Sequence, residues 1–281
     1  MKRLLTLLMI VVAILVAGCT GTDHSSSSNG IIIESFGPMV AQVEPNEQFD
    51  IIAKIRNVGG AEVKNIRPEI YGLAEWRLQG PYGVPDSLLP PDPTGKIQGE
   101  EAEISWVATA PAYATGIDNQ EFELRIYYRY STSALAQIKV ATDSYIKSFP
   151  SDQQEAKRNE LGVKMEKTTS GPISVSITAP SKVLKNTNTL RIVVDIQNIG
   201  GGSLTNNELP ISIKSSVGSI SCDVSSPIKL SSGKSKQIRC TVNVGGLDKG
   251  WEIIPIEVDL NNYEYWVNSV ASISVLPTEK G

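Results

Sequence analysis

Apolar side chains occupy every second position in two stretches of this chain that lie 141 residues apart. Residues 49–56 and 190–197 both alternate in this way, and each stretch leads into an Asn-Val/Ile-Gly-Gly motif, at 57–60 and 198–201. A period of two is typical of a strand with one buried face. Asn and Gly tolerate positive φ, so each motif marks a place where the chain can turn back into the next strand.

A second match follows at an offset of 134, where Gly and apolar positions within 99–126 recur within 233–260. The difference between the two offsets places seven extra residues in the first copy, between about Tyr71 and Gly99. This interval contains the proline-rich run 80–93. The chain therefore contains two copies of one unit, and the first copy carries an insertion near 73–98.

Each copy has the spacing of short strands and turn residues that is typical of a β-sandwich of about 100 residues. We expect strands at 31–36, 48–56, 62–71, 101–109, 120–130 and 137–147 in the first copy, and at 173–178, 189–197, 209–215, 218–224, 235–244, 252–260 and 264–275 in the second. The predicted division is a first sandwich at 31–149 and a second at 172–277.

The segment between the copies, 150–171, has a different character. Ser151-Asp152-Gln153-Gln154 has the form of a capping box and opens a polar, helix-favouring run. We expect a short exposed helix at about 151–160 and then a linker to about Pro172. A disordered linker is the alternative, because isolated helices this short are marginal in water.

The first 18 residues have the features of a signal peptide. Lys2 and Arg3 precede an apolar, uncharged run at 4–17, which is short for a membrane span of about 20 residues. The run ends in Leu15-Val16-Ala17-Gly18-Cys19, which resembles the lipobox of bacterial lipoproteins and of some archaeal ones. The resemblance implies a diacylglycerol group on Cys19 and an extracytoplasmic protein anchored to the cell membrane. The alternative is an ordinary secretory signal, or an uncleaved anchor, with an incidental cysteine.

Residues 19–30 are rich in Ser and Gly and predict a flexible tether. The single histidine of the chain, His24, lies in it. One solvated histidine argues against Ser-His-Asp and Cys-His catalysis and against histidine-based zinc sites. Removing Lys2 and Arg3 with the signal reduces the basic residues from 26 to 24 against 30 acidic ones, so no basic footprint for nucleic acid is present.

The strand that ends in Asn-x-Gly-Gly, the later Gly before an Ile/Trp strand and the Gly before the next long strand together resemble CARDB-type (cell-adhesion-related) domains of bacterial and archaeal surface proteins. The resemblance covers about 44–130 and 185–262. It implies an all-β protein of two tandem Ig-like antiparallel β-sandwich domains, acting as a spacer or docking surface without catalytic residues. The chain departs from a simple array of such domains in its proline-rich insertion and in the cysteine pair of its second copy.

With Cys19 assigned to lipid, Cys222 and Cys240 remain, and an even pair in an exported protein predicts a disulfide. Each alternates with apolar neighbours, so we expect both thiols to point into the core of the second sandwich.

Catalytic and metal-binding arrangements are not evident. Glu101 and Glu103 alternate with apolar residues, as expected for a solvated sheet face rather than a carboxylate pair for glycoside hydrolysis. Residues 116–121 lack the density of acidic residues of a calcium loop, and the glycine pairs have no helix behind them to hold phosphate. The sequence predicts a non-enzymatic protein without cofactor or metal.

The insertion is the candidate binding loop, because residues present in only one copy are not needed by the shared fold. Trp76, Tyr82, Leu88 and Leu89 match no strand period there, and five prolines restrict the backbone. The alternative is that these side chains fold back as a lid on the core of the first sandwich.

Two functions remain open. The first is a membrane-anchored surface module for binding, adhesion or scaffolding, with a protein or surface polymer as partner. The second is an accessory lipoprotein of an envelope secretion, transport or pilus-type assembly.

Overall fold

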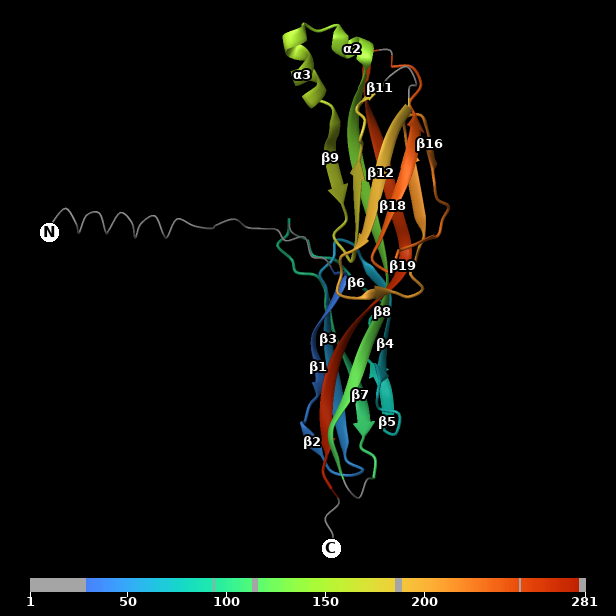
Figure 1. Cartoon of the computed structure of the whole chain (residues 1–281). Coiled ribbons are helices and arrows are strands. Elements are labelled where there is room, and N and C mark those ends of the chain that lie inside the picture. Colours follow the sequence, from blue (N-terminus) through green and yellow to red (C-terminus); the bar gives the residue numbers. More distant parts are fainter. Residues whose placement is uncertain (1–28, 93, 113–115, 185–188, 248, 278–281) are drawn as a thin grey trace, which may run out of the picture.

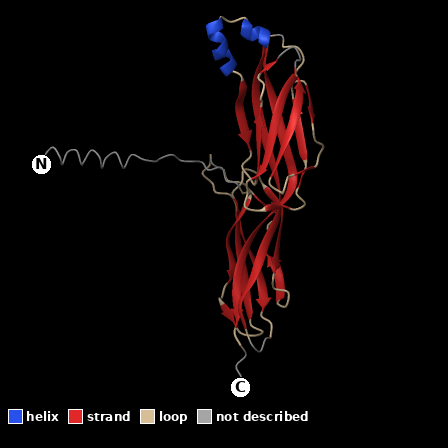
Figure 2. Ribbon diagram, viewed as in Figure 1, coloured by secondary structure: helices blue, strands red, loops and turns tan. Residues whose placement is uncertain are grey.

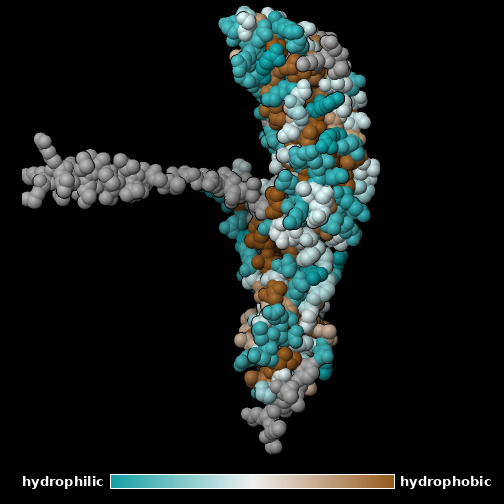
Figure 3. All heavy atoms as spheres, viewed as in Figure 1, coloured by the Kyte–Doolittle hydropathy of each residue, from teal (hydrophilic) through white to brown (hydrophobic). Residues whose placement is uncertain are grey.

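The computed structural model describes residues 29–92, 94–112, 116–184, 189–247 and 249–277. The described chain forms a rod of two β-sandwiches placed end to end, with two short helices at the far end of the second sandwich (Figures 1 and 2). The all-β prediction with two Ig-like antiparallel sandwiches is confirmed. Hydrophilic residues cover most of the side seen in Figure 3, and hydrophobic residues form a narrow strip along the rod.

In the first sandwich, one sheet has the order β1-β3-β7-β5 and faces a second sheet that contains β4 and β8. Its elements are β1 (Ile31–Pro38), β2 (Gln42–Val43), β3 (Gln48–Asn57), β4 (Val63–Tyr71), β5 (Arg77–Tyr82), β6 (Ser87–Leu88), β7 (Glu101–Thr109) and the first half of β8 (Ile117–Thr142). Alternate residues of β3 and β7 are buried between the sheets, as their period of two predicts.

In the second sandwich, the order β10-β12-β18-β16 repeats the same arrangement. Its elements are β9 (Gly162–Thr168), β10 (Ile173–Thr178), β11 (Val183–Leu184), β12 (Thr189–Asn198), β13 (Ser203–Leu204), β14 (Glu208–Leu209), β15 (Ile211–Ser215), β16 (Ser219–Cys222), β17 (Ile228–Lys229), β18 (Ser235–Asn243) and the first half of β19 (Trp251–Val275). The helices α2 (Asp143–Lys147) and α3 (Ser151–Asn159) connect the two copies.

The two longest strands, β8 and β19, belong to both sandwiches. They pair antiparallel along almost their whole length, from Trp251 opposite Ala141 to Val275 opposite Ile117. In the lettering of an Ig sandwich, β8 begins as strand F of the first copy and continues as strand G of the second. β19 begins as strand F of the second copy and continues as strand G of the first. The copies therefore exchange their last strands.

This exchange differs from the predicted division at 31–149 and 172–277. The predicted strands 120–130 and 137–147 are largely one strand, and so are 252–260 and 264–275; residues 143–147 form α2 instead. Between the two predicted strands, the register of β19 shifts from Leu260 to Tyr263, and Asn262 has a φ of 56°. A bulge accommodates the one extra residue of β19 there, so the strand continues without reversing.

The connecting segment contains more structure than predicted. The helix expected at 151–160 is present as α3, but its N-cap is Pro150 and makes no side-chain capping bond, so the predicted capping box is wrong. Residues 162–168, predicted as linker, form β9, which pairs with β8 from Ala134 to Lys139. The structure therefore adds a strand to the second sandwich that has no described counterpart in the first.

The Asn-x-Gly-Gly motif of the first copy lies where the two sandwiches meet. Asn57 is fully buried; its Nδ2 donates to the carbonyls of Ala61 and Leu88 at 2.9 and 2.8 Å, and its Oδ1 accepts the Gly59 N–H at 2.9 Å. A Cβ atom at Gly59 would lie 2.2 Å from the Tyr130 hydroxyl oxygen. Glycine is required here because a tyrosine packs on the backbone.

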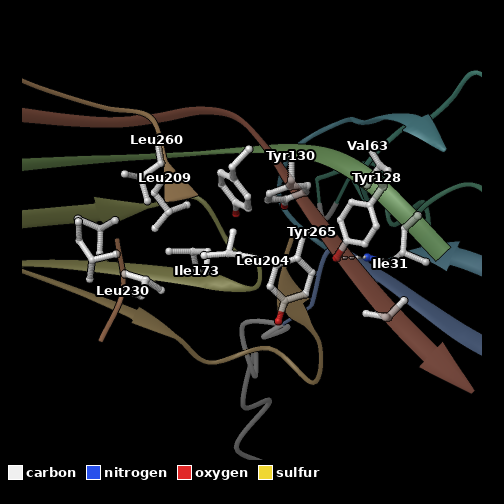
Figure 4. Close-up of a cluster of buried hydrophobic side chains, with 14 of the residues drawn as sticks. Ile31, Val63, Tyr128, Tyr130, Ile173, Leu204, Leu209, Leu230, Leu260 and Tyr265 are labelled. Atoms are coloured by element: carbon white, nitrogen blue, oxygen red, sulfur yellow. Dashed lines mark hydrogen bonds between the residues drawn. The ribbon is translucent and has the colours of Figure 1, made fainter. Parts of the chain in front are cut away.

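The second copy repeats this arrangement with Asn198 and Tyr265, whose hydroxyl accepts the Gly202 N–H at 3.0 Å and donates to Asn198 Oδ1 at 2.8 Å. Within the apolar junction shown in Figure 4, the ring of Tyr128 contacts those of Tyr130 and Tyr265, with centroids 6.4 and 5.8 Å apart. Burial raises the pKa of Tyr265 to about 12 and that of Tyr130 to about 12, so both hydroxyls stay neutral and hydrogen-bonded at physiological pH.

The predicted disulfide between Cys222 and Cys240 is present. The two residues face each other on neighbouring strands, β16 and β18, so the bond staples an edge strand of one sheet and does not join the two sheets. Cys240 is buried and Cys222 is partly buried, which agrees with thiols directed to the core.

We expect replacement of both cysteines by Ser to lower the free energy of unfolding by about 3 kcal/mol, because the disulfide restricts a loop of the unfolded chain. Thermal unfolding of the double variant and of the wild-type protein with and without reductant measures the loss. Equal melting temperatures in all three samples would contradict it.

Candidate binding face

The structure places the four residues of the predicted binding loop in two different environments. Trp76 and Leu88 are buried in the core of the first sandwich, whereas Tyr82 and Leu89 are 51% and 52% exposed. Trp76 packs edge-to-face on Phe49 with ring centroids 5.7 Å apart. Trp76 and Leu88 are therefore structural, as the lid alternative anticipated, and cannot form an exposed docking surface.

The insertion also contains strands that the sequence pattern did not predict. β5 pairs with β7 at one edge of the first sheet, and β6 pairs with β4 through Val63 opposite Leu88. The alternation was obscured because β5 lies at an edge, where most of its side chains are exposed. The insertion thus mainly completes the sandwich.

A different surface collects the aromatic and charged side chains of the first sandwich. It is the outward face of three neighbouring strands, each of which supplies three residues in matching register. We call it the aromatic–arginine face, and it consists of Arg67, Glu69 and Tyr71 of β4, Tyr127, Arg125 and Glu123 of β8, and Trp266, Asn268 and Val270 of β19.

Arg125 lies at the centre of this face, between two aromatic rings. Its guanidinium carbon is 4.7 Å from the ring centroid of Tyr71 and 4.9 Å from that of Trp266. Arg67 covers the ring of Tyr127 at 4.8 Å, and Tyr127 contacts Trp266 with centroids 6.3 Å apart. Cation–π contacts of this kind hold flexible side chains in a fixed arrangement.

Ion pairs balance the charges of the face. Glu123 accepts two hydrogen bonds from Arg125, at 2.9 and 3.0 Å, and this hydrogen bonding lowers the pKa of the Glu123 carboxyl. Arg67 pairs with Glu69 at 3.0 Å, and the hydroxyl of Tyr71 donates to Glu69, which lowers the pKa of that carboxyl. The face is consequently preorganised and has no strong net charge.

The second sandwich lacks these aromatic side chains at the corresponding positions. The offset of 134 places Asp259 at the position of Arg125 and Asn261 at that of Tyr127. There, Asp259 accepts a hydrogen bond from the Ser133 hydroxyl at 2.8 Å and lies 4.0 Å from Lys214. The shared fold is therefore built without an aromatic–arginine face, and its presence in one copy needs another explanation.

Sequence reasoning missed this face because its residues come from strands that lie far apart in the chain. The available signal was the alternation itself, which assigns Arg125 and Tyr127 to the outward positions between buried Leu124, Ile126 and Tyr128. The partner Trp266 lies on β19 and was assigned by sequence to the other sandwich. Only the strand exchange brings it alongside.

The remaining expectations concern catalysis, metal binding and the N-terminus. Glu101 and Glu103 are exposed, and Glu101 pairs with Arg56 at 2.6 Å. Within the described ranges, no three His, Cys, Asp or Glu side chains are grouped so as to hold a metal ion, and no helix is long and apolar enough to cross a membrane. Cys19 and His24 lie outside the described residues.

No family model and no curated protein sequence matches this chain. Solved structures similar to it include the envelope protein VP37 from White Spot Syndrome Virus, with 10% identity over 49% of this chain and 98% of that one at a TM-score of 0.27. The secreted serine protease VesC from Vibrio cholerae has 10% identity over 85% and 50%, at 0.22, and the D00-D0 domain of Intimin has 10% identity over 88% and 98%, at 0.24. These scores are too low to support an inference about function.

Proposed function

We propose that this protein is a non-enzymatic surface module for binding, adhesion or scaffolding, held at a cell membrane by a lipid on Cys19. The observation that carries the proposal is the aromatic–arginine face, which one copy of the duplicated fold has and the other lacks. Tyr, Trp and Arg are the residue types that contribute most to binding at protein interfaces. The resemblance to CARDB-type modules agrees with such a role.

The Cys222–Cys240 disulfide supports an extracytoplasmic location, since disulfides persist in oxidising compartments. The described chain begins at the waist of the rod (Figure 1), where the Asn29 side chain accepts the Gly201 N–H at 2.9 Å and the Gly30 carbonyl accepts the Val58 N–H at 2.8 Å. Residues 19–30 can span at most about 40 Å when extended. A lipid on Cys19 would therefore attach the protein near the junction of the two sandwiches and keep this junction close to the membrane.

We expect replacement of Tyr127 and Trp266 by Ala to abolish capture of envelope partners after cross-linking in cells. The melting temperature should change by only a few degrees, because both side chains lie on the outward face and are partly exposed. Leu135→Ala is the matched control, since Leu135 is an exposed apolar residue of β8 on the second sandwich. Undiminished capture by the double variant would refute the assignment of this face, and capture of subunits of a secretion, transport or pilus assembly would favour the accessory role.

The lipid anchor has a separate test. Cys19→Ser removes the thiol to which the lipid would be attached. We therefore expect an unprocessed or released protein and loss of labelling by a radioactive fatty acid. A variant that is matured and retained in the membrane like the wild type would rule out lipidation at this position.

A further inference from the structure

The outer edge of β19 beside the aromatic–arginine face is only partly paired. β13 pairs with it at Tyr265 and Trp266, and β2 pairs with it at Ser274 and Val275. On this outer edge, opposite the edge that pairs with β8, no strand of the described chain pairs with the seven residues between, 267–273. We call this segment the β19 slot; it is about 23 Å long at 3.3 Å per residue.

Among the described residues, the outward backbone groups of the slot have no hydrogen-bond partner on another strand. Backbone groups of alternate residues point to the same edge of a strand. The carbonyl of Glu264 accepts the Thr205 N–H at 3.1 Å on this edge, and the N–H of Ser274 donates to the Ala41 carbonyl at 3.2 Å. The N–H and C=O groups of the even-numbered residues between them therefore also point outward, and those in the slot are Asn268, Val270 and Ser272.

The duplicated fold shows what fits such a slot. In the second sandwich, the same strand position is taken by β8, and its end pairs in parallel with β11 just as β19 pairs with β2. Along the residues that correspond to the slot, β9 pairs antiparallel with Ala134–Lys139. One copy of the fold thus holds an extended strand at the place that the other copy leaves open.

The side chains of the slot lack the features that protect natural sheet edges. Exposed edge strands usually carry charged residues or proline, which prevent pairing with other chains. The slot reads Val-Asn-Ser-Val-Ala-Ser-Ile, without a charge, and Val270 is 58% exposed. By contrast β9, which forms the outer edge of the second sandwich, carries Lys164, Glu166 and Lys167. An edge without charged residues is consistent with a strand that pairs with a partner strand when the protein is bound.

We propose that the β19 slot binds one extended strand of a partner protein, paired antiparallel with residues 267–273. The proposal rests on the proposed binding function and specifies the partner. Backbone hydrogen bonds would supply affinity, and the outward side chains of the added strand would lie next to Trp266, Asn268 and Val270, which favours β-branched or aromatic residues in the partner.

Two other occupants fit less well. The residues of the first copy that correspond to β9 are 20–26, Thr-Gly-Thr-Asp-His-Ser-Ser, which include Gly and Asp, two types depleted from strands, and no large apolar side chain to pack on the sheet. A second copy that paired through its own β19 edge would be obstructed, because β19 continues past the slot at both ends and would meet the β13 and β2 of the other copy. A single free strand, about 4.8 Å from β19, avoids this obstruction.

Amide hydrogen exchange on the full chain in detergent tests whether the slot is open. The N–H groups of Asn268, Val270 and Ser272 should exchange rapidly, whereas those of Leu135 and Lys139, which face β9, should be protected. Protection of the three slot amides in the isolated monomer would mean that the chain's own residues fill the slot. Protection that disappears on dilution would mean that a second copy fills it. Either result overturns the proposal.

The second test uses a displayed library of nine-residue peptides selected on the full chain. Val270→Pro removes one outward N–H at an exposed edge position, so the fold should tolerate it, while Leu135→Pro, at a position paired with β9, should lower the melting temperature. Peptides that bind the wild type should lose about tenfold or more in affinity for Val270→Pro and bind Val270→Thr normally.

Peptide binding that is insensitive to Val270→Pro, or a selection that yields no peptide dependent on this position, overturns the strand-binding proposal. Such a result leaves the proposed function standing if Ala at Tyr127 and Trp266 still abolishes partner capture. Conversely, Val270-dependent peptides with no partner captured in cells would support the slot and count against the proposed cellular role.

Discussion

A fragment that ends at the predicted domain boundary, residues 31–149, is expected to show no cooperative unfolding transition. It lacks the second half of β19, which supplies the last strand of the first sandwich. The missing strand includes the buried side chains of Tyr263, Tyr265 and Ile273. Burying each large apolar side chain contributes about 1.5–3 kcal/mol, so the loss is of the same order as a whole domain's stability of about 5–15 kcal/mol.

A direct connection between the first half of β8 and the second half of β19 should restore the fold of the first sandwich. Tyr130 and Tyr263 are opposite each other in the β8–β19 ladder, so residues 31–130 joined through Asn-Gly to residues 263–277 would close the first sandwich with a two-residue hairpin. We expect this chain to unfold cooperatively, as judged by circular dichroism and calorimetry. Cooperative unfolding of 31–149 itself would show that β8 can fold back on its own and would contradict the requirement for exchange.

The second large effect is expected for Asn57→Ala. Removing the amide leaves the Ala61 and Leu88 carbonyls without this donor inside the junction, and the Gly59 N–H keeps only its longer bond to the Gly30 carbonyl, at 3.3 Å. Each unsatisfied buried group costs about 1–3 kcal/mol, so the free energy of unfolding should fall by about 3 kcal/mol or more. At about 2–4 °C per kcal/mol, the melting temperature should drop by roughly 10 °C.

Asn198→Ala is the matched control for this prediction. Asn198 makes the corresponding bonds to Gly202, Gly233 and Gly200 at longer distances of 3.1, 3.5 and 3.2 Å, it also accepts the Tyr265 hydroxyl at 2.8 Å, and it is only partly buried. Water can replace part of the hydrogen bonding that the amide provides, so the melting temperature should drop less than it does for Asn57→Ala. Equal destabilisation by the two substitutions would show that burial does not decide the cost at this motif.

Several features of the protein follow from the sequence alone. Alternation of apolar and polar residues determines which face of a strand can be buried, so the strands at 48–57, 101–109, 189–198 and 235–243 were predicted to within one or two residues. The internal duplication and the Cys222–Cys240 pair also needed no structure. The strand pattern is local to each segment, the duplication is visible when the sequence is compared with itself, and two remaining cysteines can pair in only one way.

Only the tertiary structure decided how the two copies are joined. The residues after Tyr130 and after Leu260 could form a hairpin or continue as a strand, because the choice depends on which distant strand lies alongside. Continuation exchanges the last strands, and this exchange brings Trp266 next to Arg125 and leaves the β19 slot open. Pairing between strands far apart in sequence is a property of the whole fold, and a period of two in one segment carries no information about its partner.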